Sequence, residues 1–237
     1  MIVVRKPQDI FQVDGRIQNG TFHGRWHFSY EQYQDPEYVH FGQLQLFNDF
    51  TLSPGALFPL HLHREIEIIS YCAGGEFCHE DEGGISGVLK KGWVQRTTVG
   101  KGMLHSVINN RQDIPMRFIQ MWFEPSKLDL EPSIEQIKVE KLDRTNCILP
   151  VVSNDHEGAL SINSDAQIYS SFLQAGKNLK YQLRDGRGVY FYVIDGGPVQ
   201  VNNNTIQTFG AAKIMDEIGL EVRSEVNTEL LLIDVSL

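Results

Sequence analysis

Two histidines lie one residue apart in the stretch GALFPLHLHREIEIISYCAG, residues 55–74, and a glutamate follows four residues later. Side chains alternate between the two faces of a β-strand, so one continuous strand would place His61, His63, Glu65 and Glu67 on the same face. Imidazole and carboxylate groups together suit Fe, Mn, Ni, Cu or Zn, and a His-x-His pair can give two nitrogens to one ion. The stretch therefore predicts part of a metal site, which needs at least one further ligand.

A third nitrogen is available from His105, which follows Gly100 and Gly102 in the segment GKGMLHSVIN. The two glycines favour a tight turn before this histidine, because the segment lacks the rest of any phosphate-binding fingerprint. A His-x-His pair alone is by default a pair of polar residues on a solvated strand face. The spacing to the flanking glycines and the downstream histidine favour metal binding by His61, His63 and His105 instead.

The two stretches are similar to the two cupin motifs. The first motif, G-x5-H-x-H-x3-E-x6-G, is matched at every position. The second, G-x5-P-x-G-x2-H-x3-N, is matched in part, since Gly100 replaces the proline and Gly92, the leading glycine, is two residues early. The matching residues are Gly55, His61, His63, Glu67 and Gly74 in the first motif, and Gly102, His105 and Asn109 in the second.

The N-terminal half resembles the pirin family more closely, through WHFSYEQYQDPEYVHFGQLQLFNDFTLSPG, FPLHLHREIEIISY, GKGMLHS and MWFEP. The C-terminal half, through VVSNDHEGALSINSDAQIY and MDEIGLEVRSEVNTELLLIDVSL, resembles the bacterial pirin-like quercetin dioxygenases. The resemblance covers nearly the whole chain. It implies an all-β bicupin, which consists of two jelly-roll barrels, each a double-stranded β-helix.

The resemblance also implies a site of three histidines and one glutamate, because the second motif of pirins usually reads H-S-E. Val107 stands here in place of that glutamate. Glu67 is the natural substitute, either as a fourth metal ligand or as a carboxylate that orients a histidine. An open three-histidine iron centre, as in certain cupin thiol dioxygenases, is a third possibility, and complete loss of the metal is a fourth.

By resemblance, the activity is that of a metal-dependent dioxygenase of the quercetin 2,3-dioxygenase type, with a flavonol as the small aromatic substrate. The expected cofactor is a divalent transition metal, Fe(II) first, with Ni, Mn, Cu or Zn as alternatives, which would hold the flavonol and O2 together. Glu67 would be the catalytic base, and the ring would open with release of carbon monoxide. The alternative is a non-catalytic pirin-like protein that binds a regulatory partner, with a structural or redox-sensing metal or with none.

Composition limits the class of protein. The net charge of −9 over 237 residues argues against direct binding of nucleic acid or of an anionic membrane surface, because both rely on clustered Lys and Arg. The three cysteines, Cys72, Cys78 and Cys147, have no metal-site spacing, and their odd number favours reduced thiols. The N-terminal residues lack the apolar core of a signal peptide, and no stretch approaches a membrane span. We expect a cytoplasmic protein that is a monomer or a homodimer.

Short apolar and aromatic runs separated by turn residues are typical of a β-sandwich or barrel. Residues 133–144 are the segment for which a helical turn is predicted, and the domain boundary is placed at their start. This gives an N-terminal cupin domain over residues 1–132 and a C-terminal cupin domain over residues 133–237. The predicted strands lie within residues 40–52, 65–81, 87–99, 115–124, 167–176, 179–186, 188–197, 198–209, 211–216, 219–224 and 228–237.

In the C-terminal domain the cupin spacing from Gly176 leads to Gln182, Arg184 and Val189 at the ligand positions. We therefore expect a degenerate barrel without metal ligands, which supports the first barrel or forms a dimer surface.

The remaining histidines and aromatic residues receive simpler predictions. The histidines that match no motif, His23, His27, His40, His79 and His156, are expected at the surface or in hydrogen bonds. Most of the aromatic residues Trp93, Phe118, Trp122 and Phe123 are expected in the barrel core, with Phe58 and Met103 in the wall of the site.

Overall fold

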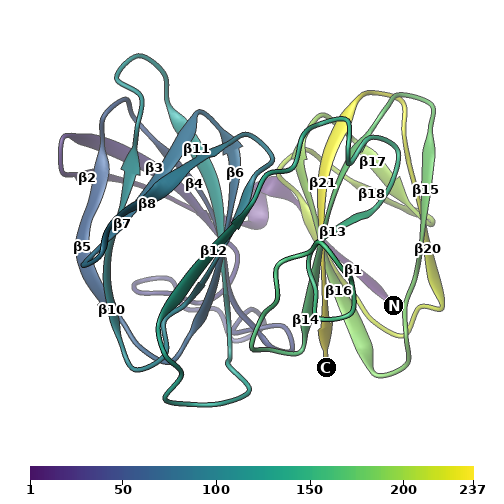
Figure 1. The fold of residues 1–237 in the computed structure, drawn as a ribbon. Coiled ribbons are helices and arrows are strands. Elements are labelled where there is room, and N and C mark those ends of the chain that lie inside the picture. The colour runs from purple at the N-terminus through teal and green to yellow at the C-terminus, as the bar shows by residue number, and fades with distance from the viewer.

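The computed structural model describes the backbone of residues 1–237 and all side chains except those of residues 85 and 86. The chain forms two β-barrels that lie side by side (Figure 1), which confirms the predicted all-β, two-barrel architecture. A short 3-10 helix spans Pro7–Asp9. Among the residues described, no helix is long and apolar enough to cross a lipid bilayer.

The first barrel packs a large sheet against a smaller one. In the described part of the chain the large sheet has the strand order β12-β9-β6-β11-β4-β3-β2, and the smaller sheet has the order β5-β10-β7-β8. The strands are β2 (Phe11–Ile17), β3 (Gly20–Trp26), β4 (Leu44–Leu52), β5 (Leu57–His63), β6 (Glu67–Gly74), β7 (Glu76–Asp81), β8 (Gly84–Lys90), β9 (Val94–Thr98), β10 (Met103–Asn109), β11 (Met116–Phe123) and β12 (Ser133–Ile137).

The second barrel has the same plan, with sheet orders β1-β19-β16-β21-β14-β13 and β15-β20-β17-β18 over the described residues. Its interior is filled by apolar side chains, which include the fully buried Val189 and Phe191. The strands are β1 (Ile2–Arg5), β13 (Leu149–Val152), β14 (Ala166–Leu173), β15 (Asn178–Gln182), β16 (Arg187–Asp195), β17 (Val199–Val201), β18 (Asn204–Ile206), β19 (Ala211–Ile214), β20 (Gly219–Ser224) and β21 (Thr228–Ser236).

Each barrel contains a strand from the other side of the predicted domain boundary. β1, at the N-terminus, pairs antiparallel with β19 of the second barrel, and β12 pairs antiparallel with β9 of the first barrel. The prediction of a helical turn over residues 133–144 is therefore wrong for its first part, because residues 133–137 are hydrogen-bonded as a strand at the edge of the first barrel's large sheet. This strand exchange ties the two barrels together through the backbone.

The large sheets of the two barrels face each other across a shared apolar layer. On β6, Ile69 and Tyr71 belong to this layer together with Tyr192 of the second barrel, whereas Cys72 belongs to the core of the first barrel together with Val107. Alternate residues of one strand thus serve two different cores, as the period-2 geometry of a strand requires. Successive residues of β6 therefore point alternately into the layer between the barrels and into the core of the first barrel.

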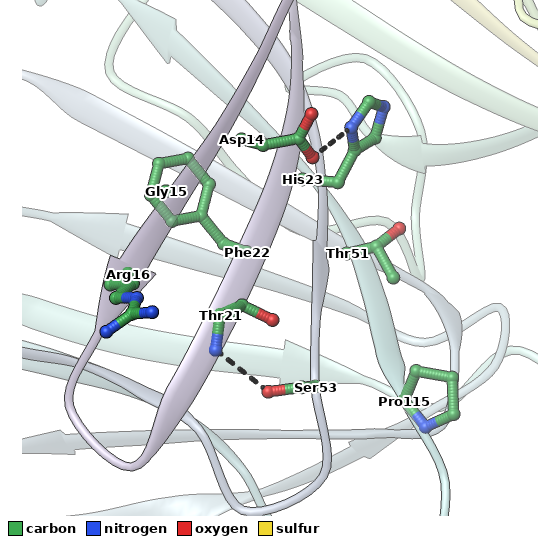
Figure 2. A pocket seen from close by; sticks show the side chains of 9 residues that line it. All are labelled: Asp14, Gly15, Arg16, Thr21, Phe22, His23, Thr51, Ser53 and Pro115. Atoms are coloured by element: carbon green, nitrogen blue, oxygen red, sulfur yellow. Dashed lines mark hydrogen bonds and ion pairs between the residues drawn. The ribbon is translucent and has the colours of Figure 1, made fainter.

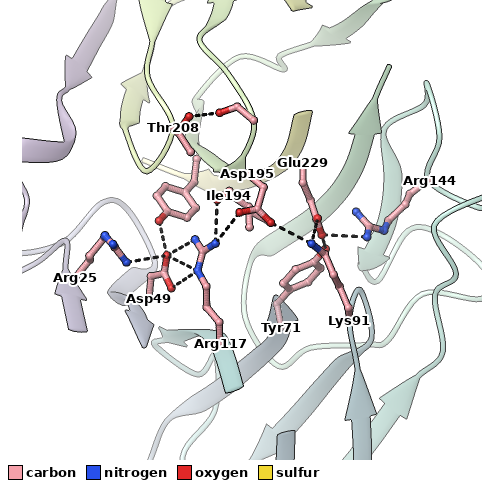
Figure 3. Close-up of polar contacts among 12 residues, drawn as sticks. Arg25, Asp49, Tyr71, Lys91, Arg117, Arg144, Ile194, Asp195, Thr208 and Glu229 are labelled. Atoms are coloured by element: carbon pink, nitrogen blue, oxygen red, sulfur yellow. Dashed lines mark hydrogen bonds and ion pairs between the residues drawn. The ribbon is translucent and has the colours of Figure 1, made fainter. Parts of the chain in front are cut away.

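Buried polar contacts join the barrels at the same interface (Figure 3). The carboxylate of Asp49 on β4 pairs with Arg117 of β11 at 2.5 Å and accepts a hydrogen bond from the Tyr192 hydroxyl of the second barrel at 2.5 Å. Removing one member of a buried pair of this kind typically costs about 3–5 kcal/mol. A neighbouring cluster is centred on Glu229, which contacts Tyr71, Lys91 and Arg144. The relative position of the barrels is thus fixed by charge as well as by apolar packing.

Candidate metal centre

The three histidines predicted as ligands lie on two neighbouring strands of the first barrel. In the antiparallel pairing of β5 and β10, His105 is the register partner of His61, and Met103 is the partner of His63. Directly opposed side chains on one face of a sheet have Cβ atoms about 4.5–5.5 Å apart. Because His61 and His63 share the parity that faces His105, the structure brings all three imidazoles together.

The resulting cluster is tight. The candidate ligand nitrogens of His61, His63 and His105 all lie within 4.8 Å of one another. The ring centroids are separated by 4.7 Å for His61 and His63, 4.6 Å for His61 and His105, and 4.9 Å for His63 and His105. One cation placed among the rings would be within reach of a nitrogen from each.

The hydrogen bonds of the histidines leave nitrogen atoms available. Nδ1 of His61 lies 2.7 Å from the carbonyl oxygen of Pro59, an interaction that fixes the ring and leaves Nε2 free to coordinate. Nε2 of His63 and both ring nitrogens of His105 are buried without a hydrogen-bond partner among the described residues. Buried polar atoms normally have partners, so these nitrogens fit a site that a metal ion completes.

The electrostatics of the cluster also suit a cation. Burial, helped by the proximity of His61, lowers the pKa of His63 to about 4. Burial, together with the neighbouring histidines, lowers the pKa of His105 to about 2. Both rings are therefore neutral at pH 7, and the neutral imidazole is the form that coordinates metals.

The structure does not bring Glu67 to the histidines, and the expectation that residues 61–67 form one strand face is wrong. The chain turns after His63, with Glu65 at a φ of 52°, and continues as β6 in the opposite sheet of the barrel. The side chain of Glu67 therefore lies on the same face of β6 as those of Ile69 and Tyr71, which belong to the layer between the two barrels. Its carboxylate accepts hydrogen bonds from the Thr98 hydroxyl at 3.2 Å and from the backbone N–H of Asn163 in the second barrel at 3.1 Å.

Val107 lies beside the histidines, at the position where the resemblance would place a glutamate. It follows a β-bulge after His105 and is 2% exposed, in the apolar interior of the first barrel. A valine side chain offers no ligand atom and no base. The described residues around the histidines therefore supply a three-nitrogen centre with no carboxylate from this strand.

A fourth histidine of the site was not identified from the sequence. His79 on β7 is 2% exposed, and its ring centroid lies 4.9 Å from that of His105. Its Nδ1 is hydrogen-bonded to Gln95 at 3.0 Å, and its Nε2 lies 3.7 Å from the carboxylate of Asp81. The prediction of a hydrogen-bonded residue is confirmed, but the placement is internal. The sequence could have indicated this position, because His79 lies two residues after Phe77 on one strand and so points, like Phe77, into the barrel.

A cavity of about 370 Å³ opens beside His61 and His63. Phe58 lines it, as predicted, whereas Met103 lines a different hollow near Asp81 and Gly102. Phe118 and Trp122 line the cavity as well, whereas Phe123 is in the inter-barrel layer and Trp93 packs against the core of the first barrel. The complete lining is Phe22, Trp26, Tyr30, Glu31, Phe50, Phe58, Pro59, His61, His63, Val107, Phe118, Gln120 and Trp122.

Other candidate sites have fewer ligand groups. A larger surface hollow of about 670 Å³ lies at the β2–β3 hairpin (Figure 2), where His23 pairs with the exposed carboxylate of Asp14 at 2.9 Å. In the second barrel Gln182 and Arg184 are exposed, Arg184 pairs with Asp155 at 3.2 Å, and Val189 is buried in the apolar interior. Within the described residues, the one group of three potential metal ligands is His61, His63 and His105.

The fold and the site together define a bicupin with a histidine-based centre in its first barrel. Two family models match the chain, Pirin over residues 10–123 and the quercetinase C-terminal cupin domain over residues 150–235. A pirin-like protein of Caulobacter vibrioides is 31% identical over an alignment of 237 positions, which covers 99% of this chain and 100% of the relative. The chain therefore belongs to the pirin family.

Two further comparisons bear on the site. The quercetin 2,3-dioxygenase of Escherichia coli K12 is 27% identical over 236 residues, 99% of each chain. The crystal structure of YhhW from Escherichia coli superposes with a TM-score of 0.91 at 26% identity, and covers 99% of this chain and 97% of its own. A structure of the bacterial pirin YhhW in complex with nickel(II) superposes with a TM-score of 0.90 at 26% identity, over 100% of this chain and 99% of that one. With the three-histidine group, this indicates a divalent metal site.

Proposed function

We propose that this pirin is a metal-dependent dioxygenase that opens flavonol rings, with the metal held by His61, His63 and His105. The observation that carries the proposal is the group of three converging imidazoles, two of which face an aromatic-lined cavity of about 370 Å³. A cavity of this size and lining is typical of sites for small aromatic ligands. The names of the relatives support the same substrate class.

The residues have distinct roles in this proposal. The three neutral imidazoles bind the ion, for which Fe(II) is our first choice, and the carbonyl of Pro59 orients His61 through Nδ1. When bound, such an ion supplies Lewis acidity and a template for the flavonol 3-hydroxyl and O2. The walls formed by Phe58, Phe118 and Trp122 orient a planar ring system and exclude water from it.

Proton transfer from the flavonol 3-hydroxyl has no base on β10, because Val107 stands beside His105. Glu67 is not proposed for this role, since its carboxylate is hydrogen-bonded to Thr98 and Asn163. Turnover would then depend on the metal to acidify the hydroxyl, and we expect it to be slow. Val107 thus favours a second candidate function, a pirin that binds an aromatic ligand or a protein partner at a metal centre without catalysis.

We propose that the protein is cytoplasmic, which its free cysteine thiols support. Cys72 and Cys78 are buried and Cys147 is exposed, and all three lack disulfide partners among the described residues. Burial raises the pKa of Cys72 to about 11, so that its thiol is neutral and unreactive. Free thiols are usual in a reducing compartment.

Anaerobic reconstitution with Fe(II), followed by addition of quercetin and O2, tests the two candidate functions. The dioxygenase predicts carbon monoxide release with consumption of O2, and loss of both in His105→Ala. Binding of quercetin to the metal-loaded protein without carbon monoxide would support the non-catalytic function instead. Failure of the reconstituted protein to retain any metal would exclude the dioxygenase.

A further inference from the structure

A glutamate occupies a strained position in the wall of the cavity. Tyr30 and Tyr33 form a tight turn through two backbone hydrogen bonds, N–H of Tyr30 to the carbonyl of Tyr33 at 3.0 Å and the reverse at 2.9 Å. Glu31 is the first central residue of this turn and has a φ of 46°. Glycine, asparagine and aspartate are favoured there, because a larger side chain costs free energy at positive φ. A non-glycine outlier of this kind, when it lines a site, motivates a functional hypothesis.

The turn is linked to the histidines by two aromatic contacts in the cavity wall. The ring of Tyr30 meets Trp122 edge to face at a centroid distance of 5.6 Å, and Trp122 in turn meets His63 at 4.9 Å. Glu31, Trp122 and His63 all line the cavity. A planar ligand anchored at the histidines would therefore extend along Trp122 toward the carboxylate of Glu31.

The charge pattern of the cavity makes this carboxylate distinctive. Of the described residues that line the cavity, Glu31 is the one carboxylate, and most of the others are aromatic. An ionised carboxylate accepts hydrogen bonds and donates none, so it selects a ligand that carries a donor at this end. Burial and the neighbouring Glu31 raise the pKa of Tyr30 to about 12, which is consistent with a phenol that already donates to this carboxylate.

We propose that Glu31 is a specificity-determining residue, which selects planar aromatic ligands that bear a phenolic hydroxyl at the end opposite their metal-binding group. The inference rests on the proposed function, because it takes the histidine end of the cavity as the anchor. A phenol fits this part of the cavity because most of the lining side chains are aromatic, and because the phenol of Tyr30 already lies beside the carboxylate of Glu31.

Binding measurements on the metal-loaded full chain test the inference without reference to turnover. Quenching of tryptophan fluorescence can report occupancy, since Trp26 and Trp122 line the cavity. The ligands are 3-hydroxyflavone, which carries only the metal-binding hydroxyl, and 3,7- and 3,4′-dihydroxyflavone, which add one hydroxyl at either distal end. The variants are Glu31→Gly, which also relieves the positive φ, and Glu31→Gln, with Glu37→Gln as an exposed carboxylate control outside the cavity.

The wild-type chain and Glu37→Gln should bind at least one dihydroxyflavone about tenfold more tightly than 3-hydroxyflavone, as expected for one hydrogen bond to a charged group. Glu31→Gly should lose this preference while its metal content and its affinity for 3-hydroxyflavone stay unchanged. Glu31→Gln should weaken the preference for the dihydroxyflavones without abolishing it. An unchanged preference in Glu31→Gly, or no preference in the wild type, overturns the role of Glu31 alone. Failure of the metal-loaded wild type to bind any of the three flavones overturns the proposed function as well.

Discussion

Val107 of β10 lies directly across the sheet from His79 of β7, and both side chains are 2% exposed in the interior of the first barrel. The position that would carry a carboxylate by resemblance is thus apolar, while its neighbour on the adjacent strand is an imidazole that packs against His105. The three candidate ligands therefore have a fourth imidazole beside them and lack the glutamate of a site of three histidines and one glutamate.

Introducing a carboxylate at residue 107 should raise the affinity of the site for metal. Val107→Glu places an anionic oxygen beside His105, and we expect metal affinity to rise by about tenfold or more, because the charge of a divalent ion is then partly balanced. Competition with a chromogenic chelator measures the change. Val107→Gln introduces a side chain with the shape of glutamate but without its charge, and should increase metal affinity by less. Equal affinities in Val107→Glu and the wild type would mean that residue 107 does not face the ion.

Removing His79 should weaken metal binding through His105. The ring of His79 packs against that of His105 at a centroid distance of 4.9 Å, so His79→Ala should free the His105 ring to move and lower metal affinity. The loss should be smaller than the roughly 10–100-fold typical of a lost hydrogen bond to a metal ligand. The same chelator competition measures it, and the exposed His156→Ala is the matched control. An affinity equal to that of the control would show that His79 has only a packing role in the barrel.

Glu67→Gln should leave metal affinity unchanged and lower stability. The carboxylate accepts hydrogen bonds from Thr98 and from the backbone of Asn163, so the substitution weakens a link between the barrels. Hydrogen bonds to a buried charged group contribute about 1.5–3 kcal/mol, and the midpoint of denaturant unfolding should fall accordingly. Loss of metal from this variant at unchanged stability would make Glu67 a metal ligand and contradict its position in the structure.

Acid should destabilise the protein partly through His27, which is fully buried and hydrogen-bonded to the Tyr190 hydroxyl of the second barrel at 2.7 Å. Burial, together with Arg5, lowers the pKa of His27 to about 3. Below the usual pKa near 6.5 the unfolded chain binds a proton that the folded chain does not, so the free energy of unfolding falls as pH decreases from 6.5 toward 3.

For a single group the slope is at most about 1.4 kcal/mol per pH unit. Denaturant unfolding at several pH values should give a smaller slope in His27→Gln than in the wild type. The exposed His40→Gln should keep the slope of the wild type. Identical slopes in His27→Gln and His40→Gln would assign the acid sensitivity to other groups.

Local patterns were sufficient to predict most strands, and the match to the two cupin motifs predicted the convergence of the three histidines. Alternation and turn residues located most of the strands from β4 onward within a few positions, whereas β1, β2, β3 and β13 were not predicted. The meeting of His61, His63 and His105 depends on the pairing of β5 with β10. The two-barrel architecture was predicted by resemblance and is confirmed.

The errors arise where tertiary structure overrides a local pattern. Glu67 has the strand parity of His61 and His63 in the sequence, but the turn at Glu65 moves it to another sheet. The pairing of β12 with β9 likewise converts a segment with helical character into an edge strand. His79 belongs to no motif, and its place beside His105 depends on the order of strands in the sheet, which sequence periodicity does not specify.

The most direct test of the account is the metal content of the purified chain after reconstitution with a divalent transition metal, measured by elemental analysis. We predict close to one tightly bound ion per chain in the wild type and in the exposed-residue control His40→Ala, and loss of that ion in His105→Ala with the fold intact by circular dichroism. A wild-type chain that retains no metal, or a His105→Ala chain that retains a full complement, would contradict the proposed three-histidine centre.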